Sequence, residues 1–527
     1  MSERVFLSGP MGSGKSQVAA ALGELWRCPV VDLDQRIEQR AGLSIPQIFE
    51  RRGESVFREL ERTLLAEILS DPSAKVVALG GGTVVDQGSR RRLLREGTLI
   101  TLRASLDTLC ARVGSGKGRP LLTGSNAEVR QRLTSVLEQR AAAYAECHAE
   151  LDTDHLSVRD LAQAVDRIVT DASIVVPLGE RTYRVEVGAG SRHALAQRAR
   201  GAVSGSQVVL VTDTGVEEPW GNRAGQELAE AGFKVTTVCL PAGEQHKNIA
   251  SIERIWDAAL GAGVDRDTLV VAVGGGVVGD MAAFAASTIL RGLSFGQLPT
   301  TLLAMVDSAV GGKTGIDRPE GKNLIGSFHQ PRFVLCDVET LTTLPLAERR
   351  AGLAEVVKSA WLDGEQSVRL LEERAEDLVA GDFDATTDAV RMSVQLKARI
   401  VTEDERETGV RALLNFGHTV GHAIEAATGF AGLRHGEAVS LGMVAAFRLS
   451  KALGVASADD VARLTRLLEK LGLPVNLDAY LDDKTLEFLG SDKKRKGGKV
   501  RFVVPGAPGE TKLEPLALDE VKRLVRS

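Results

Sequence analysis

Few folds accommodate the stretch at residues 9–16, which reads GPMGSGKS and satisfies the pattern GxxxxGK[ST]. It follows the apolar residues 5–7, a predicted strand, and precedes residues 17–26, whose composition is typical of a helix. In that context glycines let backbone N–H groups point at phosphate oxygens, Lys15 neutralises the phosphates and Ser16 can hold Mg²⁺. The pattern predicts a nucleotide-binding loop. The alternative is an ordinary turn between a strand and a helix.

The order of predicted strands and helices divides the chain into two parts. Over roughly the first 170 residues, predicted strands alternate with helical stretches, as in a parallel α/β sheet with flanking helices. Near Asp171 the pattern changes to a hairpin-like pair and then to a second α/β pattern. We expect a phosphate-loop domain over 1–170, and a second part over 172–527 made of a Rossmann-like α/β lobe (172–340) and a mainly helical lobe (341–527).

Composition excludes several classes of protein. A net charge of −5 and a pI near 6.0 do not indicate the excess of basic residues that is typical of nucleic-acid-binding proteins. No stretch approaches the ~18 unbroken apolar residues of a membrane span. Five scattered cysteines without a CxxC pair predict neither disulfides nor a thiolate zinc site, so we expect a cytoplasmic protein. Glycine supplies 55 of 527 residues, above the average of ~7%, which suggests many loops that contact ligands through the backbone.

Two aspartates lie at the end of the predicted strand after the phosphate loop, which by itself does not identify the acceptor of the phosphate. Asp32 and Asp34 follow a predicted strand, and period two places both carboxylates on one side. One could orient water on Mg²⁺ while the other accepts a hydrogen bond from an attacking hydroxyl. For the two aspartates, a solvated turn is the alternative.

Residues 1–170 resemble shikimate kinase. The resemblance rests on the DxD pair at 32–34, FRELE at 57–61, GGG at 80–82, RPLL at 119–122 and Arg140. It implies a P-loop kinase in which residues 112–119 form a mobile lid that closes over the nucleotide. Gln17 departs from the threonine usual in the family, but it leaves the lysine and serine of the loop intact.

The resemblance also implies roles for individual residues of this part. Three would be catalytic: Lys15, Asp34 and Arg119. ATP would contact Gly12, Ser13, Gly14, Lys15, Ser16 and Arg119. Shikimate would contact Asp34, Arg58, Gly80, Gly81, Gly82 and Arg140. Mg²⁺ would bind Ser16 and Asp32.

Glycine-rich turns recur in the second part of the chain. Residues 274–280 read GGGVVGD, follow the predicted strand 269–273 and open a helix, which favours a pyrophosphate site over a structural turn. The usual acidic residue ~20 positions later is not evident, so Asp213 at an earlier strand end could contact the ribose instead. Lys313 and Lys322 lie beside glycines and suggest a bound anion, with a surface loop as the alternative.

Three histidines, His418, His422 and His435, cluster in the helical lobe. His418 and His422 are four residues apart on one helical face, a spacing that suits a shared metal, and Glu355 is another candidate ligand with Lys358 one turn on. No glutamate directly follows His418, so this is not the HExxH of a zinc protease. Ordinary core or surface histidines are the alternative.

Residues 172–527 resemble 3-dehydroquinate synthase. The matching stretches occur in the order of the family: 241–247, 274–280, 299–307, 354–358, 414–425 and 434–437. The resemblance implies that Glu355, His418 and His435 bind Zn²⁺, with Co²⁺ as an alternative metal, and that His422 faces the substrate, against the pairing that spacing alone favours. Ala283 stands where the family has glycine and Gly215 where it has asparagine. Neither departure removes a group with chemistry to perform.

The second resemblance implies a cofactor set and a substrate set. NAD⁺ would contact Asp213, Glu244, Lys247, Gly275, Gly276, Val277, Asp280, Thr300, Thr301, Lys313, Lys322 and Thr343. DAHP, a seven-carbon keto acid phosphate, would contact Arg291, Asp307, Lys313, Lys322, Asn323, Lys358, Lys397, Arg411, Asn415, His422 and Lys494 or its neighbour Lys493. The catalytic residues among them would be Arg291, Asp307, Lys313 and His422.

Together the resemblances imply a bifunctional cytoplasmic enzyme of aromatic amino-acid biosynthesis. One half would phosphorylate shikimate with ATP and Mg²⁺. In the other, NAD⁺ would take a hydride from DAHP and return it after phosphate leaves, while Zn²⁺ polarises the oxygen. The expected partners are small molecules, with a homodimer formed through the synthase part. Three alternatives stay open: a sedoheptulose 7-phosphate cyclase or a metal-dependent alcohol dehydrogenase in the second part, or a non-catalytic regulatory module in either.

Overall fold

The computed structural model describes residues 4–114, 126–170, 173–429, 432–489, 495–496 and 499–526. The lid arginine Arg119, the predicted boundary residue Asp171, and Lys493 and Lys494 lie outside these described residues. The chain forms two compact units, Met1–Arg184 and Val185–Ser527. The domain bounds expected at 170 and 340 stay predictions. In the parts of the chain that the structure describes, every helix is too short or too polar to cross a bilayer.

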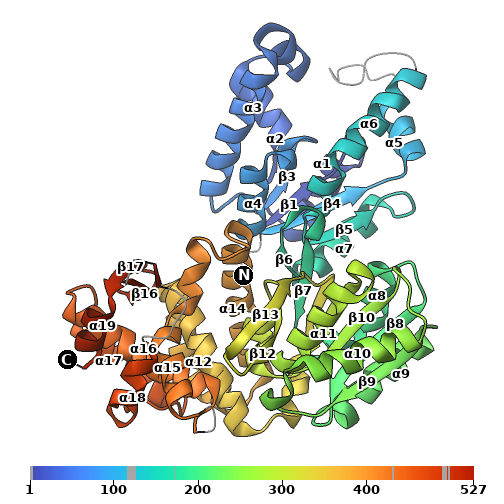
Figure 1. Cartoon of the computed structure of the whole chain (residues 1–527). Helices are drawn as coiled ribbons and strands as arrows, with labels where there is room; N and C mark the ends of the chain where they lie inside the picture. The colour runs from blue at the N-terminus through green and yellow to red at the C-terminus, as the bar shows by residue number, and fades with distance from the viewer. Residues whose placement is uncertain are drawn as a thin grey trace. The chain divides into compact units, whose positions relative to one another are not determined.

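A five-stranded parallel sheet forms the centre of the first unit (Figure 1). Its strands, in spatial order, are β2 (Val30–Asp32), β3 (Val76–Ala78), β1 (Val5–Ser8), β4 (Thr98–Arg103) and β5 (Ala149–Asp152). The helices around it are α1 (Lys15–Trp26), α2 (Leu33–Ala41), α3 (Ile45–Ser70), α4 (Gln87–Glu96), α5 (Leu106–Val113), α6 (Asn126–Ala145) and α7 (Val158–Thr170). The predicted parallel sheet with flanking helices is confirmed.

Strand β1 shows why helices cover both faces of this sheet. Successive side chains of a strand point to opposite faces. Val5 and Leu7 pack with apolar residues of α1 and α7, whereas Phe6 packs with residues of α2, α3 and α4. All three side chains are fully buried. Because the strands are parallel, their carboxyl ends share one edge, and the phosphate loop, Asp32 and the triple glycine after β3 all follow strands at that edge.

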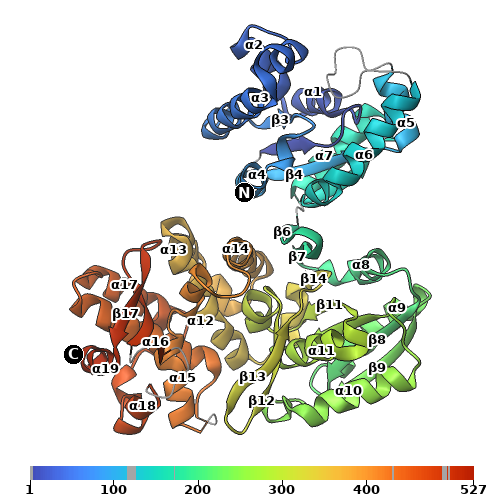
Figure 2. The ribbon, with the colours of Figure 1, turned by 45° about the horizontal axis from the view of Figure 1, so that its top comes forward.

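A seven-stranded sheet organises the α/β lobe that follows the first sheet in the chain (Figure 2), and its first strand and the start of its second lie at residues 174–184, before the division between the two units. Its strands, in spatial order, are β6 (Ile174–Val176), β7 (Tyr183–Val187), β14 (Phe333–Cys336), β11 (Ser294–Pro299), β10 (Leu269–Gly274), β8 (Gln207–Asp213) and β9 (Lys234–Leu240). The last five pair in parallel. The lobe's helices include α8 (Leu195–Ala202), α9 (Asn222–Glu230), α10 (Ile249–Gly261) and α11 (Gly276–Thr288). The Rossmann-like prediction is confirmed.

Strand β10 is apolar along its whole length because helices cover both of its faces. Val270 and Ala272 pack with residues of α10 and α11. Leu269, Val271 and Val273 face the other way and pack with residues of α8 and α9. The glycine turn that follows β10 is therefore held between a buried strand and the start of α11.

The remaining part of the second unit is mainly helical, as predicted, but it also contains strands that the sequence analysis did not foresee. Its helices are α12 (Leu346–Asp363), α13 (Glu365–Ala380), α14 (Phe383–Glu403), α15 (His418–Ala427), α16 (His435–Ala452), α17 (Ala458–Lys470), α18 (Asp483–Phe488) and α19 (Leu518–Arg526). A small antiparallel sheet joins β15 (Arg495–Lys496), β16 (Lys499–Pro505) and β17 (Thr511–Ala517). In the α/β lobe, the glycine–lysine loops belong to an antiparallel hairpin of β12 (Lys313–Arg318) and β13 (Gly321–Phe328).

Two glycines let three helices of this lobe pack closely. A Cβ built on Gly442 of α16 would lie 1.8 Å from the carbonyl oxygen of Gly417, the residue before α15. A Cβ built on Gly436 would lie 1.8 Å from the carbonyl oxygen of Ala351 in α12. Only glycine permits these approaches, which bring the first residues of α15 and α16, both histidines, close to α12.

We expect Gly442→Ala to lower the free energy of unfolding of the second unit by about 1–3 kcal/mol, because the added methyl group forces α15 and α16 apart. Gly261→Ala is the matched control, since Gly261 is also helical and a Cβ there would meet no atom within 4 Å. Urea unfolding followed by far-ultraviolet circular dichroism compares the two. Equal midpoints for both variants would contradict the close-packing argument.

Candidate active sites

The glycines of the phosphate loop hold backbone conformations that other residues rarely adopt. The φ angle is +138° at Gly9, +85° at Gly12 and +92° at Gly14, which caps α1. Lys15 folds back over the loop, and its Nζ donates to the carbonyl oxygens of Gly9 and Pro10 at 2.9 and 3.0 Å. The start of α1 therefore presents backbone N–H groups and an ammonium group together, as a phosphate site requires.

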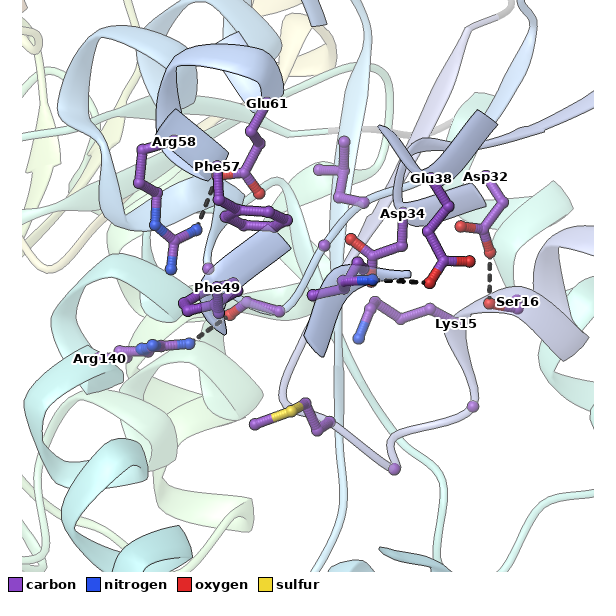
Figure 3. Close-up of a pocket in the computed structure, with 18 of the residues that line it drawn as sticks. Lys15, Ser16, Asp32, Asp34, Glu38, Phe49, Phe57, Arg58, Glu61 and Arg140 are labelled. Atoms are coloured by element: carbon purple, nitrogen blue, oxygen red, sulfur yellow. Dashed lines mark hydrogen bonds and ion pairs between the residues drawn. The ribbon is translucent and has the colours of Figure 1, made fainter. Parts of the chain in front are cut away.

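Ser16 and Asp32 meet beside this loop (Figure 3). Ser16 Oγ donates to Asp32 Oδ2 at 2.7 Å. The other oxygen, Asp32 Oδ1, accepts the backbone N–H of Gln35 at 3.2 Å and so caps α2. Hydroxyl and carboxylate oxygens are ligands that Mg²⁺ prefers. The pair fits the predicted magnesium site.

Asp34 lies in the same cavity, and its surroundings change its acidity. A Cβ on Gly80 would lie 2.8 Å from Asp34 Oδ1, so the glycine leaves room for the carboxylate. Burial raises the pKa of Asp34 to about 6, although the nearby Lys15 ammonium lowers it. A carboxylate with this pKa is ionised at neutral pH and is matched to accept a proton there.

A buried carboxylate to which the sequence analysis gave no role holds Arg58 in place. Glu61 is 4% exposed and accepts hydrogen bonds from Arg58 Nη1 and from Thr83 Oγ1, both at 2.7 Å. Glu54 is a second, exposed partner of Arg58 at 3.2 Å. The spacing of Arg58 and Glu61, three residues apart on α3, is the sequence signal that could have identified this pair.

Arg140 lies across the cavity from Lys15 and on the same side as Arg58 (Figure 3). Its Nη1 donates to the carbonyl oxygen of Gly81 at 2.9 Å, and the Tyr144 hydroxyl donates to the same oxygen at 2.6 Å. The cavity has a volume of about 600 Å³. Its lining includes the predicted residues Gly12, Gly14, Lys15, Ser16, Asp32, Asp34, Arg58, Gly80, Gly81, Gly82 and Arg140. The cavity thus joins a phosphate loop to two guanidinium groups.

We expect Glu61→Gln to destabilise the first unit by about 1–3 kcal/mol, because Arg58 loses a charge-assisted hydrogen bond to a buried acceptor. Glu67→Gln on the same helix is the control. Glu67 pairs with Arg40, and both side chains are about half exposed, so the change should stay below ~0.5 kcal/mol. Hydrogen exchange of the β1 amides measures both effects, and equal losses would argue against a buried anchor.

In the second unit, the glycine turn before α11 has the features of the predicted cofactor site. Gly275 caps α11 and brings no side chain to its first N–H groups. A Cβ on Gly275 would lie 3.1 Å from Thr301 Cγ2, and one on Gly276 would lie 2.9 Å from Ser308 Oγ. Thr300 Oγ1 is buried and has no hydrogen-bond partner among the described atoms. Open amide groups beside an unused hydroxyl fit a pyrophosphate group.

A buried lysine joins residues predicted for the cofactor and for the substrate. Lys247 Nζ donates to Asp280 Oδ2 at 2.5 Å and to Asn323 Oδ1 at 2.6 Å. Burial raises the pKa of Asp280 to about 6, although Lys247 lowers it. Asn323 has a φ of +53°, and its backbone N–H donates to Asp317 Oδ1 at 2.8 Å. The hairpin is therefore tied to the start of α11 through one ammonium group.

Glu355, His418 and His435 converge from α12, α15 and α16. Glu355 Oε1 lies 3.5 Å from His418 Nε2 and 3.9 Å from His435 Nε2. The candidate ligand atoms of the three residues all lie within 4.8 Å of one another. Glu355 is 1% exposed, and its Oε1 accepts no hydrogen bond among the described atoms. An orphaned buried carboxylate oxygen beside two imidazoles fits a zinc ion.

The second ring nitrogens of two of these histidines already have partners. His418 Nδ1 lies 3.1 Å from the carbonyl oxygen of Phe416, which can only accept, so Nδ1 carries the proton and Nε2 is free to bind a metal. His435 Nδ1 lies 3.3 Å from Glu425 Oε2, a contact that the sequence analysis did not foresee. His422 belongs to a different group, with Glu425 and His435. The geometry does not pair His418 with His422 as ligands of one ion.

Two lysines lie against Asp307 beside this group. Lys397 Nζ donates to Asp307 Oδ1 at 2.5 Å, and Lys358 Nζ lies 4.0 Å from the same oxygen and also contacts the Glu355 carboxylate. Despite burial, Lys397 and Lys358 hold the pKa of Asp307 well below its usual range. Burial lowers the pKa of Lys397 to about 8. An amine with this pKa can release or take up a proton near neutral pH.

Glu407 links two predicted substrate residues and was missed from the sequence. Its carboxylate contacts Lys313 Nζ and accepts a hydrogen bond from Asn415 Nδ2 at 2.7 Å. Arg411 is buried, and its Nη2 donates to the carbonyl oxygen of Gly311 at 3.0 Å. The stretch around Glu407 is rich in acidic residues. No local pattern distinguishes this carboxylate from a solvated one.

Further predicted residues lie elsewhere in the second unit. Asp213 ends β8, and burial raises the pKa of its carboxyl group. Lys322 Nζ lies 3.7 Å from Glu244, another predicted cofactor residue. Thr343 accepts a hydrogen bond from an indole N–H at 2.8 Å. Arg291 is exposed, with a φ of +69° in the tight turn after α11.

Comparison with protein families assigns both parts of the chain. Residues 11–171 match the model described as shikimate kinase. Residues 237–351 match 3-dehydroquinate synthase N-terminal, and residues 352–495 match 3-dehydroquinate synthase C-terminal.

Individual relatives agree with this assignment. The 3-dehydroquinate synthase of Pelobacter propionicus is 44% identical over 351 residues, 67% of this chain and 98% of the relative. That of Symbiobacterium thermophilum is 47% identical over 341 residues, 64% of this chain and 95% of the relative.

Two solved structures share the fold of the second part. One is 2-deoxy-scyllo-inosose synthase complexed with carbaglucose-6-phosphate, NAD⁺ and Co²⁺, with a TM-score of 0.60 and 25% identity over 67% of this chain and 99% of that chain. The other is the 2-epi-5-epi-valiolone synthase ValA from Streptomyces hygroscopicus subsp. jinggangensis with NAD⁺ and Zn²⁺ bound, with a TM-score of 0.59 and 28% identity over 65% of this chain and 96% of that chain.

Proposed function

The chain belongs to the 3-dehydroquinate synthase family and carries a shikimate kinase domain at residues 11–171, and on this premise we propose that it is a bifunctional enzyme of the shikimate pathway. One unit phosphorylates shikimate with ATP. The other converts DAHP to 3-dehydroquinate and phosphate. The observation that carries the proposal is that each unit gathers groups suited to its own reaction: a phosphate loop and two arginines around one cavity, and the buried Glu355 and His418 together with the half-buried His435 in one group.

In the kinase unit, the chain's own residues orient the two substrates. The phosphate loop and Lys15 hold the phosphates of ATP. Arg58 and Arg140 offer guanidinium groups to the carboxylate of shikimate. Asp34, ionised above pH about 6, accepts the proton of the attacking hydroxyl. Mg²⁺, held through Ser16 and Asp32, neutralises phosphate charge when bound.

In the synthase unit, the chain supplies groups that bind the substrate and a lysine that can hold or release a proton beside the reacting centre. When bound, NAD⁺ supplies reversible hydride transfer, and Zn²⁺ or Co²⁺ on Glu355, His418 and His435 polarises an oxygen. Lys397, whose pKa is about 8, can hold or release a proton beside Asp307. The residues that would bind the acidic substrate include Lys313, Lys322, Asn323, Lys358, Arg411 and Asn415.

The alternative functions are not favoured. Other sugar-phosphate cyclases share the fold, but the two above are 25% and 28% identical, against 44% and 47% for the synthases of the family. A metal-dependent alcohol dehydrogenase has no need for the phosphate-binding set at Lys313, Lys322 and Asn323. A non-catalytic module does not require the complete set of charged groups that each unit retains.

Location and assembly complete the proposal. A cytoplasmic location is supported by five cysteines that form no disulfide in the structure. A homodimer formed through the synthase unit follows from the family resemblance. Analytical ultracentrifugation of the whole chain tests the assembly, and a monomer at micromolar concentration would refute it.

Separate substitutions should divide the two activities. Lys15→Ala removes the ammonium group that holds the ATP phosphates and should lower the shikimate kinase rate at least about 100-fold, with the synthase rate unchanged. His435→Ala should do the reverse. Both rates are measured on the purified chain, as shikimate 3-phosphate formed from ATP and as phosphate released from DAHP with NAD⁺ and Zn²⁺. Loss of both activities in either variant would refute independent sites.

The kinase rate should fall as Asp34 becomes protonated. Because burial raises the pKa of Asp34 to about 6, the ionised base is lost below that pH. We expect kcat/KM for shikimate to fall about tenfold per pH unit below pH 6. Asp34→Asn should lower the rate and flatten this limb. The synthase rate of the same variant should keep the wild-type pH profile, and a shared change would point to unfolding instead.

A further inference from the structure

Glu425 on α15 occupies a position between the predicted metal ligands and the β12–β13 hairpin. Its side chain is 5% exposed. Oε2 lies 3.3 Å from His435 Nδ1, and Oε1 lies 3.5 Å from Lys322 Nζ. Both oxygens therefore have a partner, in contrast to Glu355 Oε1, which accepts no hydrogen bond among the described atoms.

The contact with Glu425 determines which ring nitrogen of His435 carries the proton. An ionised carboxylate can only accept, so the proton of the neutral imidazole lies on Nδ1 and points at Glu425. The lone pair of Nε2 then faces Glu355 Oε1, 3.9 Å away. A hydrogen-bonded carboxylate behind a ligating histidine orients the ring and makes the free nitrogen a stronger donor.

The contact with Lys322 carries this effect to a second element. Lys322 belongs to β13, and its Nζ lies between Glu425 of the helical lobe and Glu244 of the α/β lobe. The next residue, Asn323, accepts a hydrogen bond from Lys247, which also pairs with Asp280. A single carboxylate therefore touches both a predicted metal ligand and the hairpin that carries predicted cofactor and substrate residues.

We propose that Glu425 is a positioning residue that fixes His435 as an Nε2 metal ligand and, through its ion pair with Lys322, aligns the β12–β13 hairpin with the metal. This inference rests on the proposed synthase function. The competing role is direct ligation, because His422, Glu425 and His435 also place candidate ligand atoms within 4.8 Å of one another. The exposure of His422 and the ammonium group beside Glu425 favour the positioning role.

Two variants of the full chain separate the functions of this carboxylate. Glu425→Gln keeps a carbonyl oxygen that can accept from His435 Nδ1, but it removes the charge that holds Lys322. Glu425→Ala removes both interactions. Glu437→Gln is the control, because Glu437 lies two residues after His435 in sequence while its carboxylate caps the start of α16 beside Arg434, and glutamine also fits that cap.

Zn²⁺ affinity, measured by competition with a chromophoric chelator, is the readout that does not depend on activity. We expect Glu425→Ala to weaken binding about 10- to 100-fold, Glu425→Gln to weaken it less than about tenfold, and Glu437→Gln to leave it unchanged. Both Glu425 variants should raise the KM for DAHP about two- to fivefold, the scale of a lost, partly exposed ion pair. The Co²⁺ absorption spectrum of Glu425→Gln should keep the band positions of the wild type.

Three results would overturn the proposal. Wild-type Zn²⁺ affinity in Glu425→Ala would show that the carboxylate does not orient His435. Complete loss of metal in Glu425→Gln, with circular dichroism and melting temperature preserved, would make Glu425 a ligand. Absence of Zn²⁺ binding by the wild-type chain would refute the proposed synthase function and this inference with it, so the two failures are distinguishable.

Discussion

Burial of ionised groups is the constraint around which the second unit is arranged. A carboxylate as buried as Glu355 is costly unless a cation, a hydrogen-bond donor or a metal lies against it. Lys358, one turn along α12, and the imidazoles at the starts of α15 and α16 supply these partners. The three helices reach the required separation because Gly436 and Gly442 have no side chains where the backbones meet. In this lobe, therefore, the same close helix packing that forms the core also brings the charged groups of the site together.

In the first unit, ionised carboxylates are likewise placed against cations, but beside a cavity. Glu61 is buried and Asp34 is half-buried beside the same cavity, and each is close to a cation, Lys15 or Arg58. Glu61 is fully paired and acts as an anchor. Asp34 is incompletely compensated, so burial raises its pKa to about 6 and suits it to proton transfer. Two carboxylates a few ångströms apart thus acquire different functions from their surroundings alone.

Much of the fold could be predicted, because the relevant signals are local. Short apolar runs alternating with helical stretches predicted the parallel sheets, and glycine turns between strands and helices predicted the two phosphate-binding edges. The β12–β13 hairpin and the sheet at β15–β17 were not foreseen. Their residues show neither a long apolar run nor a two-residue turn signal, and five of the eight residues of β13 are exposed.

The candidate sites were predicted less completely, and the residues that were missed were all missed for the same reason. Glu61, Glu407 and Glu425 are glutamates in helical or acidic stretches, where most glutamates are solvated. Their partners distinguish them, as does burial for Glu61 and Glu425, and part of this environment comes from residues distant in the chain, namely Thr83, Lys313 and Lys322.

The amino-acid sequence alone determined the two α/β units, the phosphate loop and the family of each part. These features depend on residues that are adjacent in sequence. The tertiary structure decided which ring nitrogen faces the metal group, which carboxylates are buried and which lysines pair with them. Spacing along one helix relates only residues of that helix, so it favoured His418 with His422. The group formed by Glu355, His418 and His435 comes from three helices, and only their packing determines which side chains meet.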